Sequence, residues 1–175
     1  MIILGYPGIG KSTAAKKMDK FIDIDSVFFR DRDDSAGWLG GKKGLNGYIW
    51  LLRKLNDDGK VVFGSTHKEV RERILKDEGI EKEDVVYICP KAEDKNAWIS
   101  RLYNRWIDST EMKDWYAYTR ALKEYEKDIK SILEDADEGV RVIQVSEEDL
   151  EDGLALYLIR NRIIEEKEED DEDED

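Results

Sequence analysis

The residues best equipped for chemistry stand near the amino-terminal end of the chain. Residues 5–13 read Gly5-Tyr6-Pro7-Gly8-Ile9-Gly10-Lys11-Ser12-Thr13 and match the Walker A pattern G-x-x-x-x-G-K-[ST] at every fixed position. Glycines let the backbone curl so that successive N–H groups point at phosphate oxygens, and a following helix adds its positive end. Lys11 is then expected to reach the β- and γ-phosphates, and Ser12 to bind Mg²⁺. The sequence therefore predicts binding of ATP, or else GTP, with Mg²⁺.

Two aspartates on the second predicted strand, residues 21–25, are the next candidates. Asp23 and Asp25 alternate along the strand, so both side chains face the same side. Ligands of an open parallel sheet bind beyond the carboxyl ends of its strands, which would place Asp25 beside the loop. A carboxylate there can accept the proton of an attacking hydroxyl or hold a Mg²⁺-bound water, while Asp23 is a candidate substrate contact. The alternative is that Asp25 only caps the next segment.

A scaffold of alternating strands and helices must position these groups. Short apolar runs predict strands over residues 2–4, 21–25, 61–63, 85–89 and 140–145. Helical spacing predicts helices over residues 11–20, 48–55, 68–77, 94–107, 115–133 and 146 to about 166. This alternation predicts an α/β fold in which a mostly parallel sheet is covered on both faces.

The charge of the chain is concentrated at its carboxyl-terminal end. The formal net charge is −13, and residues 165–175 contribute −9 with ten acids and one Lys, which leaves −4 for residues 1–164. The chain length suits one domain over residues 1–164. Residues 165–175 have no apolar side chain and are expected to form a disordered acidic tail that solubilises the protein or binds a partner.

Several classes of protein are excluded by composition. One Cys and one His cannot make an internal disulfide or a Cys/His zinc site. The longest apolar run, residues 154–159, is far shorter than the about 20 residues that cross a bilayer. The glycine-rich loop begins at residue 5, which leaves no room for a signal peptide. We therefore expect a cytoplasmic protein without a membrane partner.

The loop at residues 5–13, with Pro and Gly in its middle, resembles the P-loops of small nucleoside, nucleotide and polynucleotide kinases. It is especially similar to the phage polynucleotide 5′-kinases, and it also looks like the small phage kinases that phosphorylate hydroxymethyluracil in viral DNA. The acid-ending second strand and a pair of arginines after the fourth strand extend the similarity over most of residues 1–135.

This resemblance implies a P-loop NTPase fold, a three-layer sandwich around a five-stranded parallel sheet in the order 2-3-1-4-5. It also implies that Asp25 acts as the base, because the second strand of polynucleotide kinases ends in such an Asp. Their Asp-Asp-Tyr-Arg style motif is only loosely echoed here by Asp25-Ser26-Val27-Phe28-Phe29-Arg30.

The paired arginines lie four residues apart on the predicted helix after the fourth strand. Arg101 and Arg105 share one helix face, and the resemblance assigns them to a lid-like region over residues 94–111. Guanidinium groups in a lid neutralise the charge that spreads over the transferring phosphoryl oxygens. The alternative is a solvated face whose arginines pair with nearby acids, namely Asp94, Asp108 or Glu111.

The polar, glycine-rich residues 30–47 are predicted to form a long loop, and the resemblance places the acceptor-binding region there. The candidate acceptor contacts are Arg30, Arg32, Trp38, Lys42, Lys43 and Thr66. Stacking of a base on Trp38 would contribute about 1–3 kcal/mol, and the alternative is that Trp38 packs on the body. For Thr66 the alternative is a helix cap, because Glu69 follows at capping-box spacing.

The sequence lacks the guanine-reading Asn-Lys-x-Asp motif of GTPases and the acid-ended third strand of motor ATPases, so small kinases remain. Hydroxyl acceptors benefit from a base, which favours a Mg·ATP kinase acting on a hydroxyl of nucleic acid or a nucleoside, with hydroxymethyluracil in phage DNA as the first candidate. Polynucleotide 5′-hydroxyl kinase and deoxynucleoside-monophosphate kinase activities remain alternatives. A nucleotide-sensing module without turnover is the third hypothesis.

Overall fold

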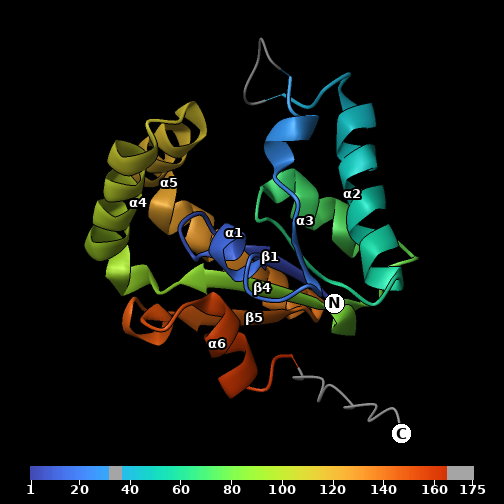
Figure 1. Cartoon of the computed structure of the whole chain (residues 1–175). Coiled ribbons are helices and arrows are strands. Elements are labelled where there is room, and N and C mark those ends of the chain that lie inside the picture. The colour runs from blue at the N-terminus through green and yellow to red at the C-terminus, as the bar shows by residue number, and fades with distance from the viewer. Residues whose placement is uncertain (32–36, 165–175) are drawn as a thin grey trace, which may run out of the picture.

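A parallel β-sheet forms the centre of the protein in a computed structural model that describes residues 1–31 and 37–164 (Figure 1). The strands of these residues are β1 (Ile2–Gly5), β2 (Phe21–Asp23), β3 (Val61–Ser65), β4 (Val85–Pro90) and β5 (Arg141–Val145). Their order is β2-β3-β1-β4-β5, and every pairing is parallel. All residues of β1 and β4 are buried, as their apolar runs require in a sheet covered on both faces. The predicted α/β fold and strand order are confirmed.

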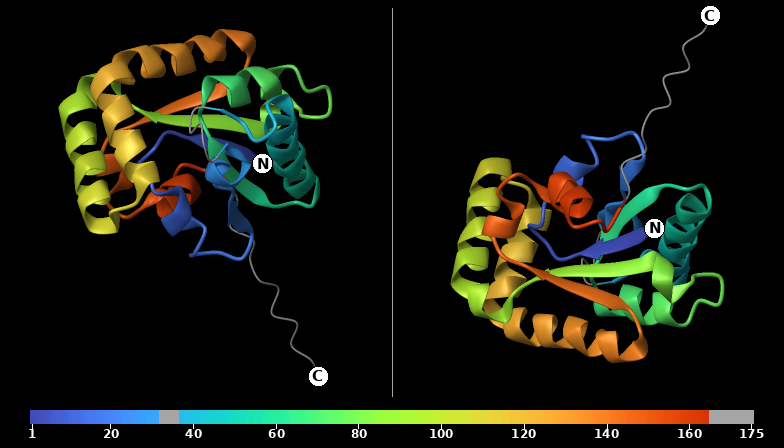
Figure 2. Two further views of the ribbon diagram at one scale, coloured as in Figure 1. Left: turned by 90° about the horizontal axis from the view of Figure 1, so that it is seen from above. Right: turned by 90° about the horizontal axis from the view of Figure 1, so that it is seen from below.

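Helices cover both faces of this sheet, which therefore forms the middle layer of three (Figure 2). In both panels α3 and α5 lie over one face, and α1 and α6 lie over the other. Helix α2 packs against β3 and α3. The helix bounds are α1 (Lys11–Ala14), α2 (Lys42–Asp57), α3 (Lys68–Leu75), α4 (Lys95–Ser109), α5 (Met112–Glu134) and α6 (Leu154–Arg160). None of the helices within the described residues is long and apolar enough to cross a membrane.

Short 3₁₀ helices fill the connections between these elements. They are η1 (Ser26–Phe29), η2 (Lys82–Asp84), η3 (Ala92–Asp94), η4 (Asp135–Glu138) and η5 (Glu148–Leu150). Of these, η1 follows β2 directly and reaches the edge of the sheet at which the candidate chemical groups lie.

The strand register brings those groups to one edge of the sheet. Gly5 is aligned with Ser65 across the β1–β3 pair, and Asp23 is aligned with Phe63 across the β2–β3 pair. Because all the strands are parallel, their carboxyl ends meet at the same edge. The glycine-rich loop, the end of β2 and the end of β3 are therefore neighbours.

Two predicted helices are shorter in the structure. The predicted helix 11–20 ends at Ala14, because the next turns use i→i+3 bonds, including Lys17 N–H to Ala14 O, and a further turn leads into β2. The predicted helix 146–166 is interrupted at Gly153, whose φ of +92° a helix does not accept, and α6 follows it.

The prediction of a loop over residues 30–47 is wrong at its end, because α2 begins at Lys42 rather than at residue 48. Gly44 lies in the first turns of α2, where a Cβ would stand 2.6 Å from the carbonyl oxygen of Leu39. This glycine therefore allows a close backbone approach instead of marking a loop. The acidic tail, residues 165–175, lies outside the described residues.

Candidate functional site

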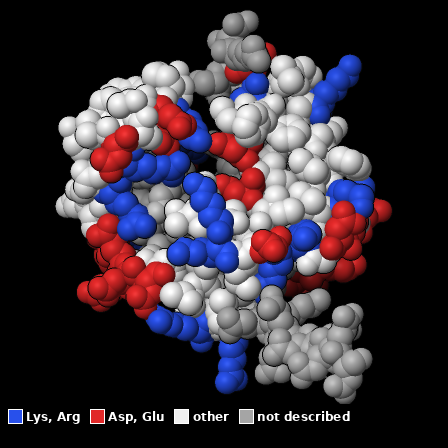
Figure 3. All heavy atoms as spheres, viewed as in Figure 1, with Lys and Arg blue, Asp and Glu red and all other residues white. Residues whose placement is uncertain are grey.

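A large cleft of about 1680 Å³ opens at the carboxyl edge of the sheet. One wall is the α4–α5 hairpin, and the other is formed by the end of β2 and by η1. The glycine-rich loop lines the cleft between them. Figure 3 shows that Lys and Arg side chains gather around this hollow together with Asp and Glu side chains.

The glycine-rich loop, residues 5–13, is tightly curled. Gly8 and Gly10 have φ angles of +90° and +95°, in the left-handed region that favours glycine. The loop is also held by α4, because the indole N–H of Trp98 donates to Pro7 O at 2.9 Å and Nε of Arg101 donates to Gly8 O at 2.8 Å. The loop and the helix of the predicted lid are thus joined directly.

Lys11 reaches back across the loop. Its Nζ donates a hydrogen bond of 2.6 Å to Gly5 O. Burial, with a smaller effect from Arg105, lowers the pKa of Lys11 to about 8, although Asp23 and Asp25 oppose this shift. The ammonium group of Lys11 is therefore poorly solvated, and a polyanion beside it would favour its charged form.

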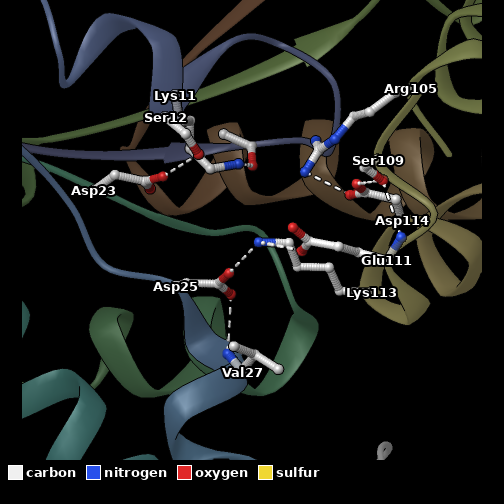
Figure 4. A network of polar contacts seen from close by, with 11 residues as sticks. Lys11, Ser12, Asp23, Asp25, Val27, Arg105, Ser109, Glu111, Lys113 and Asp114 are labelled. Carbon is white, nitrogen blue, oxygen red and sulfur yellow. Dashed lines mark hydrogen bonds and ion pairs between the residues drawn. The ribbon is translucent and has the colours of Figure 1, made fainter.

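The two aspartates occupy different positions (Figure 4). Asp23 accepts a hydrogen bond of 2.5 Å from the hydroxyl of Ser12. Asp25 lies beyond the end of β2, where its carboxylate accepts from Val27 N–H at 3.0 Å and pairs with Lys113 at 3.2 Å. The prediction that Asp25 ends the strand is wrong. Asp25 does cap the next segment, because it is the N-cap of η1.

The described residues contain no cluster of three or more His, Cys, Asp or Glu side chains suited to a metal ion. The adjacent oxygens of Ser12 and Asp23 are instead a partial set of ligands. Mg²⁺ commonly takes one or two protein oxygens and completes its shell with water and substrate phosphates. This pair fits a Mg²⁺ ion that arrives with a nucleotide.

Both predicted lid arginines line the cleft, but neither has the expected acidic partner. Arg101 lies 3.8 Å from Glu147, from the segment after β5. Arg105 pairs at 2.6 Å with Asp114, which is only 3% exposed and also accepts from Ser109 Oγ at 2.6 Å (Figure 4). The expected alternative partners in residues 94–111 are therefore wrong, and Arg105 is oriented by the turn between α4 and α5.

The residues predicted to contact an acceptor are dispersed. Trp38 is 9% exposed and packs against Tyr48, with the Arg30 guanidinium 4.0 Å from its ring centroid, so it does not offer a free face to a base. Arg30 lines the cleft. Lys42 and Lys43 are exposed in the first turn of α2, outside the cleft lining.

The two remaining acceptor candidates have different outcomes. Arg32 lies outside the described residues. Thr66 is buried, and the expectation that it caps α3 is wrong, because His67 occupies the N-cap position without a side-chain cap bond. Thr66 lines a second, smaller cavity beside the cleft.

One hydroxyl fixes the ends of two strands that border the site. Tyr48, which is fully buried in α2, donates to Ile24 O at 3.1 Å and accepts from Ser65 N–H at 2.9 Å. Gly64 leaves room for this contact, because a Cβ there would stand 3.1 Å from the Tyr48 hydroxyl and 2.8 Å from Leu4. Helix α2 thereby ties the end of β2 to the end of β3.

Sequence reasoning missed one face of α5. Lys113, Tyr116 and Arg120 all line the cleft, and their i, i+3, i+7 spacing was the available signal. The side chain of Tyr116 is 48% exposed. Arg120 makes two hydrogen bonds of 2.8 Å with Asp128.

The arrangement brings a curled backbone loop, a buried ammonium group, a hydroxyl–carboxylate pair and two guanidinium groups to one cleft. These groups can bind a polyphosphate and compensate its charge. No family model, curated protein or solved structure matches the chain, so the function is inferred from these residues alone.

Proposed function

We propose that the protein is a Mg·ATP-dependent kinase that transfers the γ-phosphate to a hydroxyl of a nucleic acid or nucleoside, with 5-hydroxymethyluracil in DNA as the first candidate acceptor. One observation carries the proposal. Lys11, the Ser12–Asp23 pair, Arg101 and Arg105 converge on a single cleft at the carboxyl edge of the sheet. In this proposal, residues 5–13 act as a P-loop that wraps the triphosphate.

The size of the cleft supports transfer between two bound molecules. A pocket for one small ligand usually has a volume of about 300–1,000 Å³, whereas this cleft has about 1680 Å³. A nucleotide and an acceptor can therefore occupy it together. The α4–α5 hairpin forms one wall, and the end of β2 with η1 forms the other, so side chains from the two walls can contact the bound molecules from opposite sides.

The proposed reaction assigns a task to each group. The acceptor oxygen forms a bond to the γ-phosphorus while the bond from that phosphorus to the bridging oxygen of ADP breaks. Lys11, Arg101 and Arg105 compensate the charge on the phosphoryl oxygens. A Mg²⁺ ion held by Ser12 and Asp23 would further neutralise this charge. The acceptor hydroxyl loses its proton in this reaction, and a carboxylate accepts that proton.

The two carboxylates divide this work in the proposal. Asp23 belongs to the metal side because it is hydrogen-bonded to Ser12. Asp25 lies farther along the cleft wall and is the base, since its present partner on α5 is the exchangeable ammonium of Lys113, which is 40% exposed. An incoming hydroxyl would replace Lys113 at one carboxylate oxygen.

A labelled-phosphate acceptor panel tests the proposal. Purified protein with Mg²⁺ and γ-labelled ATP is given DNA containing 5-hydroxymethyluracil, DNA with a free 5′-hydroxyl, free nucleosides or deoxynucleoside monophosphates. We expect label in a hydroxyl acceptor, a loss of at least about 100-fold with Lys11→Met, and little change with Lys16→Met, which alters an exposed lysine outside the cleft.

Other outcomes of the panel would overturn the proposal in different ways. Label only in monophosphates would make the protein a nucleoside-monophosphate kinase. ATP binding without transfer to any acceptor would favour a nucleotide-sensing module. Absence of ATP binding would remove the P-loop assignment itself.

A further inference from the structure

A second cavity of about 410 Å³ lies beside the cleft, between α3, α5 and the carboxyl ends of β1 and β3. Its volume falls in the range of about 300–1,000 Å³ that suits one small ligand. The loop residues Lys11 and Ser12 and both lid arginines line the large cleft but not this cavity. The two spaces share one wall, formed by Pro7, Ser65, His67, Ala117, Arg120 and Glu124. A ligand in the smaller cavity can therefore extend into the cleft.

Two hydroxyl groups that make no hydrogen bond within the described residues belong to the lining of this cavity. Thr66 is 8% exposed and Tyr6 is 4% exposed, and neither side-chain hydroxyl has a hydrogen-bond partner among residues 1–31 and 37–164. Neither oxygen is among the fully buried polar atoms that lack a partner, so both remain accessible for a hydrogen bond. The cavity thus presents hydrogen-bonding capacity that the described part of the chain does not use.

The histidine in the shared wall is uncharged at neutral pH. Burial, together with the nearby cations Arg30, Arg120 and Lys11, lowers the pKa of His67 to about 3. A neutral imidazole offers one donor and one acceptor. It can therefore bind a neutral polar ring, but it supplies no positive charge for a phosphate.

The cations around the smaller cavity are already neutralised. Each Lys or Arg that lines the smaller cavity pairs with an acidic side chain, and His67 is neutral. The pairs are Arg71–Asp135, Arg120–Asp128, Lys127–Glu124, Lys68–Glu72 and Lys130–Glu134. Within residues 1–31 and 37–164, the lining of this cavity therefore has no unpaired Lys or Arg for an anionic group.

We propose that the smaller cavity holds the neutral nucleobase of the acceptor, while the acceptor hydroxyl extends past the shared wall toward the glycine-rich loop. A nucleobase is planar, uncharged at neutral pH and carries both donors and acceptors, which complement two hydroxyls and a neutral imidazole. The inference rests on the proposed kinase function and assigns the acceptor's base, rather than its phosphate, as the recognised part.

Binding calorimetry on the full chain tests this assignment. The protein is first saturated with Mg²⁺ and a non-hydrolysable ATP analogue, and is then titrated with the common deoxynucleosides, 5-hydroxymethyldeoxyuridine, thymidine monophosphate and free deoxyribose. We expect at least one nucleoside to bind with a Kd below about 1 mM and more tightly than deoxyribose. The affinity for thymidine monophosphate should exceed the affinity for thymidine by less than tenfold.

Three variants locate the binding site. Thr66→Val keeps the shape and removes the hydroxyl, and it should raise the nucleoside Kd by about tenfold while leaving the Kd of the ATP analogue within about twofold. Thr66→Ser should restore nucleoside binding. Thr119→Val is the matched control, because Thr119 lines only the large cleft and its hydroxyl bonds to Trp115 O at 3.0 Å.

The assignment is overturned if no nucleoside binds to the ATP-analogue complex, or if deoxyribose binds as tightly as the nucleosides. It is equally overturned if the monophosphate binds more than tenfold tighter than thymidine, or if Thr66→Val leaves the nucleoside Kd unchanged. Failure of the ATP analogue to bind is a separate result, and it removes the proposed function instead.

Discussion

Nucleotide binding should make the protein take up a proton through Lys11. Burial and Arg105 hold the pKa of this side chain at about 8 in the free protein. Beside a triphosphate the ammonium form is favoured, so the bound lysine is fully protonated. Uptake on binding should then be about 0.1 proton at pH 7, about 0.5 at pH 8 and about 0.9 at pH 9.

Calorimetry of Mg·ATP binding in buffers of different ionisation enthalpy measures this uptake directly. Lys11→Arg keeps the positive charge but does not titrate in this range, so its uptake should be close to zero. Lys16→Met, outside the cleft, should retain the wild-type uptake. Uptake that does not rise between pH 7 and pH 9, or that persists in Lys11→Arg, would refute the placement of Lys11 against the phosphates.

The same shift affects the stability of the free protein. The pKa of Lys11 in the folded state, about 8, is below its ordinary value of 10.5, so the unfolded chain binds more protons between these limits. The contribution of Lys11 to the free energy of unfolding should therefore rise with pH from about 8 to about 10.5. Comparison of urea unfolding of the wild type and Lys11→Met over this range isolates the contribution.

Further predictions concern the carboxylates, the lid and the core. Asp23→Asn should raise the Mg²⁺ concentration for half-maximal activity by about 10- to 100-fold. Asp25→Asn should instead lower kcat by about 10²–10⁴-fold at saturating Mg²⁺. If both variants shift the magnesium titration equally, the two carboxylates do not have the proposed separate roles. Arg105→Ala should lower kcat by about 10²–10³-fold with little change in the Kd for ATP, and single-turnover kinetics with an unchanged rate would contradict this. Arg71 is only 3% exposed and pairs with Asp135, so Arg71→Ala leaves this carboxylate without its partner. The substitution should destabilise the fold by about 3–5 kcal/mol. The exposed pair of Arg160 and Asp152 is the control, since Arg160→Ala should cost about 1 kcal/mol or less in urea denaturation.

The sequence predicted the sheet well because its signals are local. Runs such as Val61–Phe63 are apolar enough to require burial on both faces, and their alternation with helices leaves few possible strand orders. Element ends were predicted less well. Gly44 reads as a loop residue by helix propensity, yet it lies inside α2 because the backbone at Leu39 approaches it closely.

The site itself depended on contacts that no local pattern contains. Alternation placed Asp23 and Asp25 on one face, but β2 ends at Asp23 and the chain turns into η1, so only Asp23 meets Ser12. Lys113 contacts Asp25 across 88 positions of sequence. That contact depends on the angle of the α4–α5 hairpin over the sheet, which is set by tertiary packing.

The hydroxyl of Tyr48 couples the position of α2 to the geometry of the proposed site. It bonds to the backbone at both Ile24 and Ser65, so the spacing between the segments that carry Asp25 and His67 follows the position of one helix. The outer face of that helix exposes Trp50. Any molecule that shifted α2 by pressing on this face would change the distance between the proposed base and the acceptor pocket without touching either.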